Sequence, residues 1–130
     1  YGTAQFAKYA DLAEKYKTLD EYPVGTVIVV ATDLVDAECM QSTVIGQPAI
    51  GVISENPAYL MNTGQGLPVA LQGRVPCRVQ GPVTRGAMMV SAGNGLARAE
   101  THPAMGTVIG KALEDFNGDQ GTIEIVVGRL

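Results

Sequence analysis

The sequence predicts an all-β domain, a small barrel or sandwich of about eight to ten short strands. The chain has 130 residues, which suits one domain with a modest core. It holds 16 Gly and 7 Pro, many turn-forming residues for this length. Turn signals separate β-branched runs at intervals of about 8–12 residues, which is typical of such folds.

The first 22 residues differ from the rest, because they hold four of the five Tyr and no Pro. Four residues follow the spacing of one helical stripe: Phe6, Tyr9, Ala13 and Tyr16. One interpretation is a short amphipathic helix lying on its own domain. The other is a helical or extended stem that packs against copies of itself. We therefore divide the chain into a stem and oligomerisation segment, 1–22, and a β-domain, 23–130.

Apolar and β-branched runs after residue 22 predict a series of strands. We expect strands at residues 26–31, 42–46, 49–54, 69–75 and 76–81, with an acidic, irregular segment at 32–42. Pro76 indicates a bulge or a sheet edge. The runs at 26–31 and 49–54 do not alternate strictly, so we expect those strands to be covered on both faces.

The C-terminal part predicts two pairs of strands. Residues 86–99 form two apolar runs around Ala-Gly-Asn-Gly, a strong signal for a hairpin with a primed turn. Residues 106–116 and 121–130 form a second pair, joined by Asn-Gly-Asp-Gln at 117–120.

The charge pattern excludes some function classes. Net charge is −4, and no Lys or Arg occurs between Lys17 and Arg74, so the clustered positive charge of a nucleic-acid binder is missing. No run of apolar residues is long enough for a membrane span, and no signal peptide is visible. Because the chain starts at Tyr1, we expect a processed product, an excised domain or the tail of something longer.

The chain offers little catalytic or ligand-binding chemistry. His102 is the only histidine, so we expect no metal site, no Ser-His-Asp set and no cofactor. Asp11 and Glu14 would share a face of a helix and could pair for acid–base work, although a solvated face is the simpler interpretation. Cys77 lies in an alternating stretch and is expected to be a buried thiol, with a bond to Cys39 left open.

Several segments together resemble a family of phage proteins. They are YADLAEKY (9–16), PVGTVIVV (23–30), IGVISENPAYLMN (50–62), VALQGRVPCRVQGPVTRGAMMVSA (69–92) and GTVIGKALEDF with GTIEIVVGRL (106–130). The chain resembles, over nearly its whole length, a domain at the C-terminal ends of tail fibre, tailspike and other bacteriophage virion structural proteins. It is more distantly similar to autoproteolytic intramolecular chaperone domains of phage appendages, through Asp11–Glu14 and Gly51–Pro57.

The resemblance implies a homotrimeric component of the virion, assembled in the host cytoplasm and exposed outside the cell. Its implied partners are its own sister chains, other virion proteins and, in one version, a host surface receptor. The distant similarity implies Asp11 and Glu14 as catalytic residues if the domain cleaves itself. The chain departs from the family at Ala87, where an acidic residue is usual, so no carboxylate acts there.

The segment GVISENPAYLMN raises a specific expectation about subunit contacts. Pro57 ends a strand, and the apolar residues 58–61 would then face a neighbouring subunit or the N-terminal stem. The expected interface residues are Phe6, Tyr9, Ala13, Tyr16, Tyr59, Leu60 and Met61. Three functions stay open: a trimeric structural module, a self-cleaving chaperone, and a glycan-binding tip, which lacks Trp for sugar stacking.

Overall fold

The computed structural model describes residues 11–32, 36–55, 57, 59–60, 62 and 65–128. The all-β prediction is confirmed, because every regular element in this part of the chain is a strand. The strands are β1 (Asp11–Tyr16), β2 (Val27–Val30), β3 (Cys39–Gln41), β4 (Gly51–Ile53), β5 (Tyr59–Leu60), β6 (Leu67–Gln80), β7 (Met88–Gly93), β8 (Leu96–Ala99), β9 (Gly110–Ala112) and β10 (Gln120–Val127). Within the described ranges, no helix could cross a membrane.

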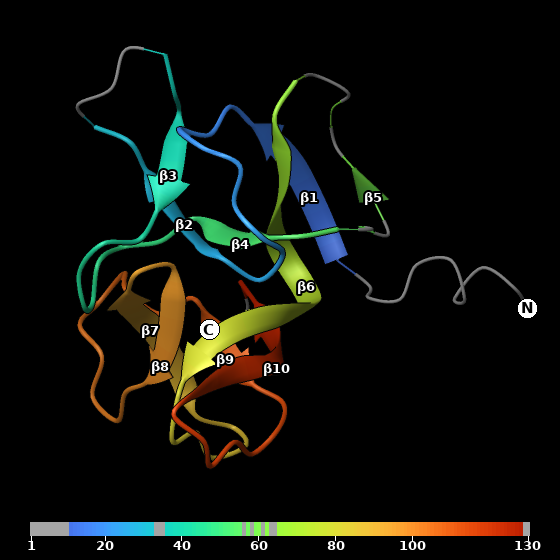
Figure 1. Cartoon of the computed structure of the whole chain (residues 1–130). Helices are drawn as coiled ribbons and strands as arrows, with labels where there is room; N and C mark the ends of the chain where they lie inside the picture. The colour runs from blue at the N-terminus through green and yellow to red at the C-terminus, as the bar shows by residue number, and fades with distance from the viewer. Residues whose placement is uncertain are drawn as a thin grey trace, which may run out of the picture.

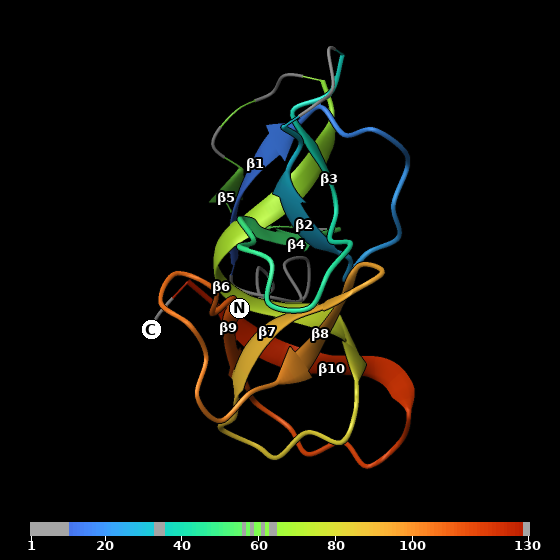
Figure 2. The same ribbon diagram turned by 90° about the vertical axis from the view of Figure 1, so that its left-hand side faces the viewer.

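The fold has two halves that share the long strand β6 (Figures 1 and 2). The first part of β6 pairs with β1 and β4, and its second part pairs with β10 and β8. The change of partner falls at Gly73, whose φ of +112° is a conformation that side chains rarely adopt. Asp11 at the start of β1 and Val127 at the end of β10 both pair with Gly73. The two ends of the described chain therefore meet at the waist between the halves.

The lower half in Figure 1 is a closed five-stranded barrel. Its strands follow the order β6, β10, β9, β7, β8 and back to β6. The β8–β6 contact is parallel and the other four are antiparallel. Closure removes the exposed edges that an open sheet of these short strands would carry.

The upper half holds the remaining strands around the first part of β6. On one side of β6 the sheet continues through β4, β2 and β3. Strand β1 also pairs antiparallel with β6, and β5 pairs in parallel with β1. Neighbouring residues of the central strands face two different cores. Val27 and Val52 face the barrel core, whereas Ile28 and Ile53 pack with Cys39 in a second cluster. This arrangement confirms that strands at 26–31 and 49–54 are covered on both faces.

The N-terminal segment differs from its helical interpretation. Asp11–Tyr16 is a strand, so a helix at these residues is wrong, and the extended alternative holds there. Every residue of β1 is paired with β6, which makes it an integral part of the sheet. Ladder bonding to a long neighbour outweighs the helical spacing of a few apolar residues. Phe6 and Tyr9 lie outside the described residues.

Three of the expected strands differ from the structure. Residues 42–46 form a loop with a single bridge, Ile45 to Ala92, and the strand lies earlier, at Cys39–Gln41. The runs 69–75 and 76–81 are parts of one strand, β6, and Pro76 pairs in register with Glu124 without a bulge. Among the described strands only β10 pairs at Pro76, so the position is locally an edge and the missing donor is tolerated.

The hairpin prediction is confirmed. β7 and β8 are joined by Asn94 and Gly95, with φ values of +54° and +74°, as a type I′ turn requires. The pairing of the last two runs is also confirmed, since β9 and β10 lie antiparallel.

Candidate functional site

Two segments far apart in the sequence meet at a buried polar contact. Asp11 begins β1 and Ser54 follows β4, and both are almost fully buried, at 2% and 5% exposure. The Ser54 hydroxyl donates a hydrogen bond of 2.7 Å to Oδ2 of Asp11. Asp11 faces Gly73, and the Ser54 amide donates to the carbonyl of Pro68, so β6 positions both residues. A buried carboxylate needs such donors, because burial without them is costly.

The contact joins two segments that lie far apart in the sequence. Asp11 belongs to the D-x-A-E segment and Ser54 to the segment before Asn-Pro, 43 residues later. Chemically, a hydroxyl bonded to a carboxylate is an oriented nucleophile beside a weak base. The sequence pattern points to Asp11 but not to Ser54, because nothing in the spacing indicates that β1 and β4 flank the same part of β6.

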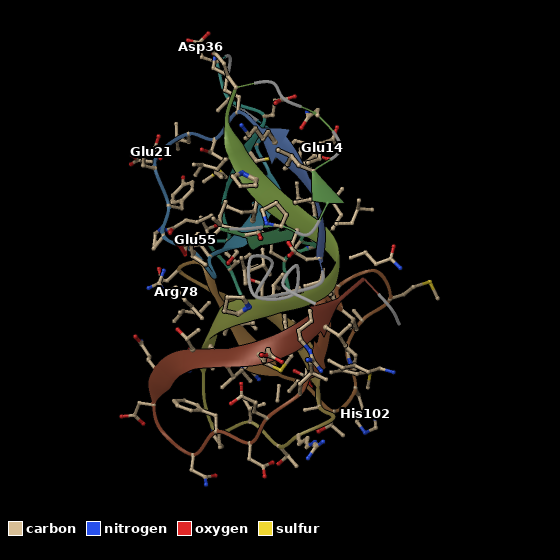
Figure 3. All side chains as sticks on the ribbon, turned by 90° about the vertical axis from the view of Figure 1, so that its right-hand side faces the viewer. Glu14, Glu21, Asp36, Glu55, Arg78 and His102 are labelled. Atoms are coloured by element: carbon tan, nitrogen blue, oxygen red, sulfur yellow. The ribbon has the colours of Figure 1, made fainter. Side chains whose placement is uncertain are left out.

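Asp11 and Glu14 do not form the expected pair on a helix face. Residues three apart on a strand point to opposite faces. The local bulge does not change this alternation on β1, because its extra residue, Leu71, lies on β6. Glu14 instead accepts a 2.8 Å hydrogen bond from the Tyr16 hydroxyl. This bond, with burial second, raises the pKa of Tyr16 to about 12. Glu14 lies in the upper half and His102 in the lower half, so the one histidine lies away from β1 (Figure 3).

Tyr59, Leu60 and Asn62 lie along β1. Tyr59 and Leu60 pair in parallel with Leu12 and Ala13. The side-chain amide of Asn62 extends this ladder, accepting from the Lys15 amide at 2.7 Å and donating to the Lys15 carbonyl at 3.3 Å. The backbone of Tyr59 and Leu60 therefore pairs with β1, whereas the direction in which the apolar patch faces stays a prediction.

The expected interface residues are spread over different environments. Ala13 is fully buried in the single chain, so it has no surface to offer a neighbour. Tyr16 packs against the second core cluster, and Leu60 is half-buried. Phe6, Tyr9 and Met61 lie outside the described residues, and only the backbone of Tyr59 is described.

Neither cysteine is bonded. Cys39 and Cys77 are both buried free thiols, in different core clusters. Desolvation raises the pKa of Cys77 to about 12 and that of Cys39, helped by the charge of Glu38, to about 11. Such thiols are poor nucleophiles and poor metal ligands. In the described part of the chain, no three His, Cys, Asp or Glu residues are grouped as a metal site.

Large apolar side chains are exposed in a loop for which the sequence predicts a strand. Val44 and Ile45 are 56% and 61% exposed in the loop 43–47, called here the Val44–Ile45 tip. Hydrogen bonds hold the tip from within the loop and from the neighbouring strand β7. Oε1 of Gln47 accepts from the amides of Thr43 and Val44, and Ser91 bonds to the tip through its hydroxyl and its carbonyl.

Comparison with known proteins finds the same fold in a phage protein. The crystal structure of the bacteriophage phi29 gene product 12 C-terminal fragment matches 92% of this chain and 100% of the fragment, with a TM-score of 0.66 and 16% identity. Pre-mature bacteriophage phi29 gene product 12 matches over 92% of this chain, with a TM-score of 0.69 and 15% identity. The present chain spans only 21% of that longer protein. No protein-family model and no curated protein matches the chain.

Proposed function

We propose that this chain is a structural module of a bacteriophage virion, which assembles as a homotrimer on a fibre or spike. The observation that carries the proposal is the fold match to the whole of the phi29 gene product 12 C-terminal fragment. The family resemblance of the sequence motifs points the same way. The C-terminal position of the similar fragment supports a terminal or capping role.

The Val44–Ile45 tip supports association with sister chains. Exposed apolar side chains that are held rigid lose little entropy on contact, so they suit a protein interface. Leu19 and Val30, 52% and 54% exposed, add apolar surface on either side of β3, since Leu19 and Val30 both pair with Cys39. Sister chains that cover these side chains would remove their apolar surface from water.

The test is to locate the chain in assembled particles. Antibodies raised against the purified protein should label a fixed appendage of the encoding phage in immunogold electron microscopy. Particles of a phage that lacks the gene serve as the control. Antigen that is abundant in infected lysate yet absent from purified, intact particles would refute a virion role.

A second candidate function is self-cleavage by an intramolecular chaperone domain. The buried Asp11–Ser54 contact favours it, because it places an oriented hydroxyl where the chain enters β1. A parent chain with its upstream segment should then be cut near the N-terminal side of this domain. Replacing Ser54 or Asp11 with Ala should abolish the cut. Glu14→Ala tests whether the Glu14 carboxylate also takes part in cleavage. A parent that stays whole, or is cut equally well in all the variants, removes this candidate.

A further inference from the structure

The chain contains two Asn–Gly dipeptides in opposite structural settings. Asn94–Gly95 forms the turn between β7 and β8, and Asn117–Gly118 lies in the loop before β10. Asn–Gly is chemically fragile because Gly lacks the Cβ that hinders attack by its own backbone nitrogen on the preceding side chain. The folded chain decides which of the two dipeptides can reach the reactive geometry.

Gly95 is held at both of its backbone polar groups. Its amide donates to the Ser42 carbonyl at 3.0 Å, and its carbonyl accepts from the Val27 amide at 2.8 Å. Gly95 is also buried, and a Cβ there would lie 2.8 Å from Cγ2 of Thr26. The Gly95 nitrogen cannot attack the Asn94 side chain unless its bond to Ser42 breaks, and the bond from Val27 and the burial of Gly95 oppose that opening.

Gly118 lacks the burial and the backbone hydrogen bonds that protect Gly95, although a Cβ there would lie 2.9 Å from Cζ of Phe116. Asn117, Gly118 and Asp119 are all exposed, and the Gly118 amide has no hydrogen-bond partner among the described residues. The loop is nevertheless anchored at its ends. Phe116 exchanges two backbone bonds with Val83, at 2.7 and 2.8 Å, and the Asp119 carbonyl accepts from the Gly81 amide at 2.8 Å.

We propose that Asn117 is a site of spontaneous modification, converting to an isoaspartyl linkage while the fold shields Asn94. The Gly118 nitrogen loses its proton to solvent and bonds to Cγ of Asn117, and ammonia leaves to give a succinimide. Water then opens the ring at either carbonyl, so the products are aspartate and isoaspartate. No oxidant or cofactor takes part.

The product would disturb the end of the barrel. An isoaspartyl linkage adds one methylene to the backbone between Phe116 and Asp119, two points that are tied to the segment 81–83. It also adds a carboxylate beside Asp119. We expect the Gly81–Asp119 bond to open in the modified chain.

The experiment incubates the full, folded chain in warm, mildly alkaline buffer and follows it by tryptic peptide mapping. Cleavage after basic residues separates Asn94, in peptide 86–98, from Asn117, in peptide 112–129. Fragmentation that distinguishes isoaspartate from aspartate assigns the product. A parallel sample in concentrated urea reports the reactivity of both dipeptides without the fold. Asn117→Gln is the control, because a Gln side chain closes the corresponding six-membered ring far more slowly.

Asn117 should convert at least about tenfold faster than Asn94 in the folded chain, since closed turns are protected by the free energy of their local opening. The two rates should be similar in urea. In the isoaspartyl fraction, amide hydrogen exchange at Gly81 should rise by at least about tenfold. Equal rates in the folded chain, or no conversion of Asn117 where urea allows it, would overturn the proposal.

Discussion

At the scale of single residues, the contact between Asp11 and Ser54 shows what sequence patterns leave out. Each residue lies in a motif, but their contact depends on β1 and β4 flanking the same stretch of β6. Sequence spacing carries no information on that arrangement. The buried thiol of Cys77, by contrast, was predictable because alternation in a strand fixes which side chains face inward.

Removing the Ser54 hydroxyl should destabilise the fold. Ser54→Ala takes a donor from a buried carboxylate, which should lower the free energy of unfolding by about 1–3 kcal/mol. Ser42 is the matched control, because its buried hydroxyl has no hydrogen-bond partner among the described residues. Ser42→Ala should therefore be neutral or slightly stabilising. Urea unfolding measures both variants, and equal losses would contradict this account of Ser54.

The Cys77 thiol should make stability depend on alkaline pH. Its pKa is raised on folding from 9.0 to about 12, so the folded state binds the proton more tightly than the unfolded state. This contribution is complete below pH 9.0 and is lost as the pH rises toward 12. The free energy of unfolding should fall over this range, and less steeply in Cys77→Ala. Urea titrations at several pH values measure the slopes, and identical slopes would exclude the thiol as a cause.

At the scale of elements, local sequence signals predicted some strands and turns correctly, whereas the others depend on long-range strand pairing. The β7–β8 hairpin was predictable because Asn94-Gly95 specifies its turn within a few residues. The strand β1 was ambiguous because its spacing also fits a helix, and only the ladder to β6 settles it. Residues 42–46 have the composition of a strand, but hydrogen bonds from the Thr43 and Val44 amides to the Gln47 side chain hold this segment as a loop.

Two glycines with similar backbones should respond differently to Ala. Gly95 and Gly106 have φ values of +74° and +82°, so a side chain at either position costs about 1–2 kcal/mol in strain. A Cβ at Gly106 meets nothing within 4 Å, whereas one at Gly95 meets Thr26 and Gln41 at 2.8 and 3.1 Å. Gly95→Ala should therefore lose a further 1–3 kcal/mol, roughly the cost of overpacking. Thermal and urea unfolding compare the variants, and equal losses would show that the hairpin relaxes freely.

At the scale of the whole molecule, the barrel carries its own core, and the surface left over suggests partners. The fold class could be predicted from turn spacing and β-branched runs, because these local features limit an all-β chain to few architectures. The two-part layout around β6 could not, because it follows from the change of partners at Gly73. The trimer remains a prediction from the family resemblance and from the exposed side chains of the Val44–Ile45 tip.

The central proposal, a structural module that associates with its sister chains, is tested most directly by sedimentation equilibrium of the purified protein. Val44→Ser with Ile45→Ser provides a variant with the tip made polar, and Met105→Ser, at the fully exposed Met105, is the control for a general loss of apolar surface. The account predicts three chain masses for the protein and the control at micromolar concentration, and a shift toward monomer for the tip variant. A single chain mass for the unaltered protein across that range would contradict it.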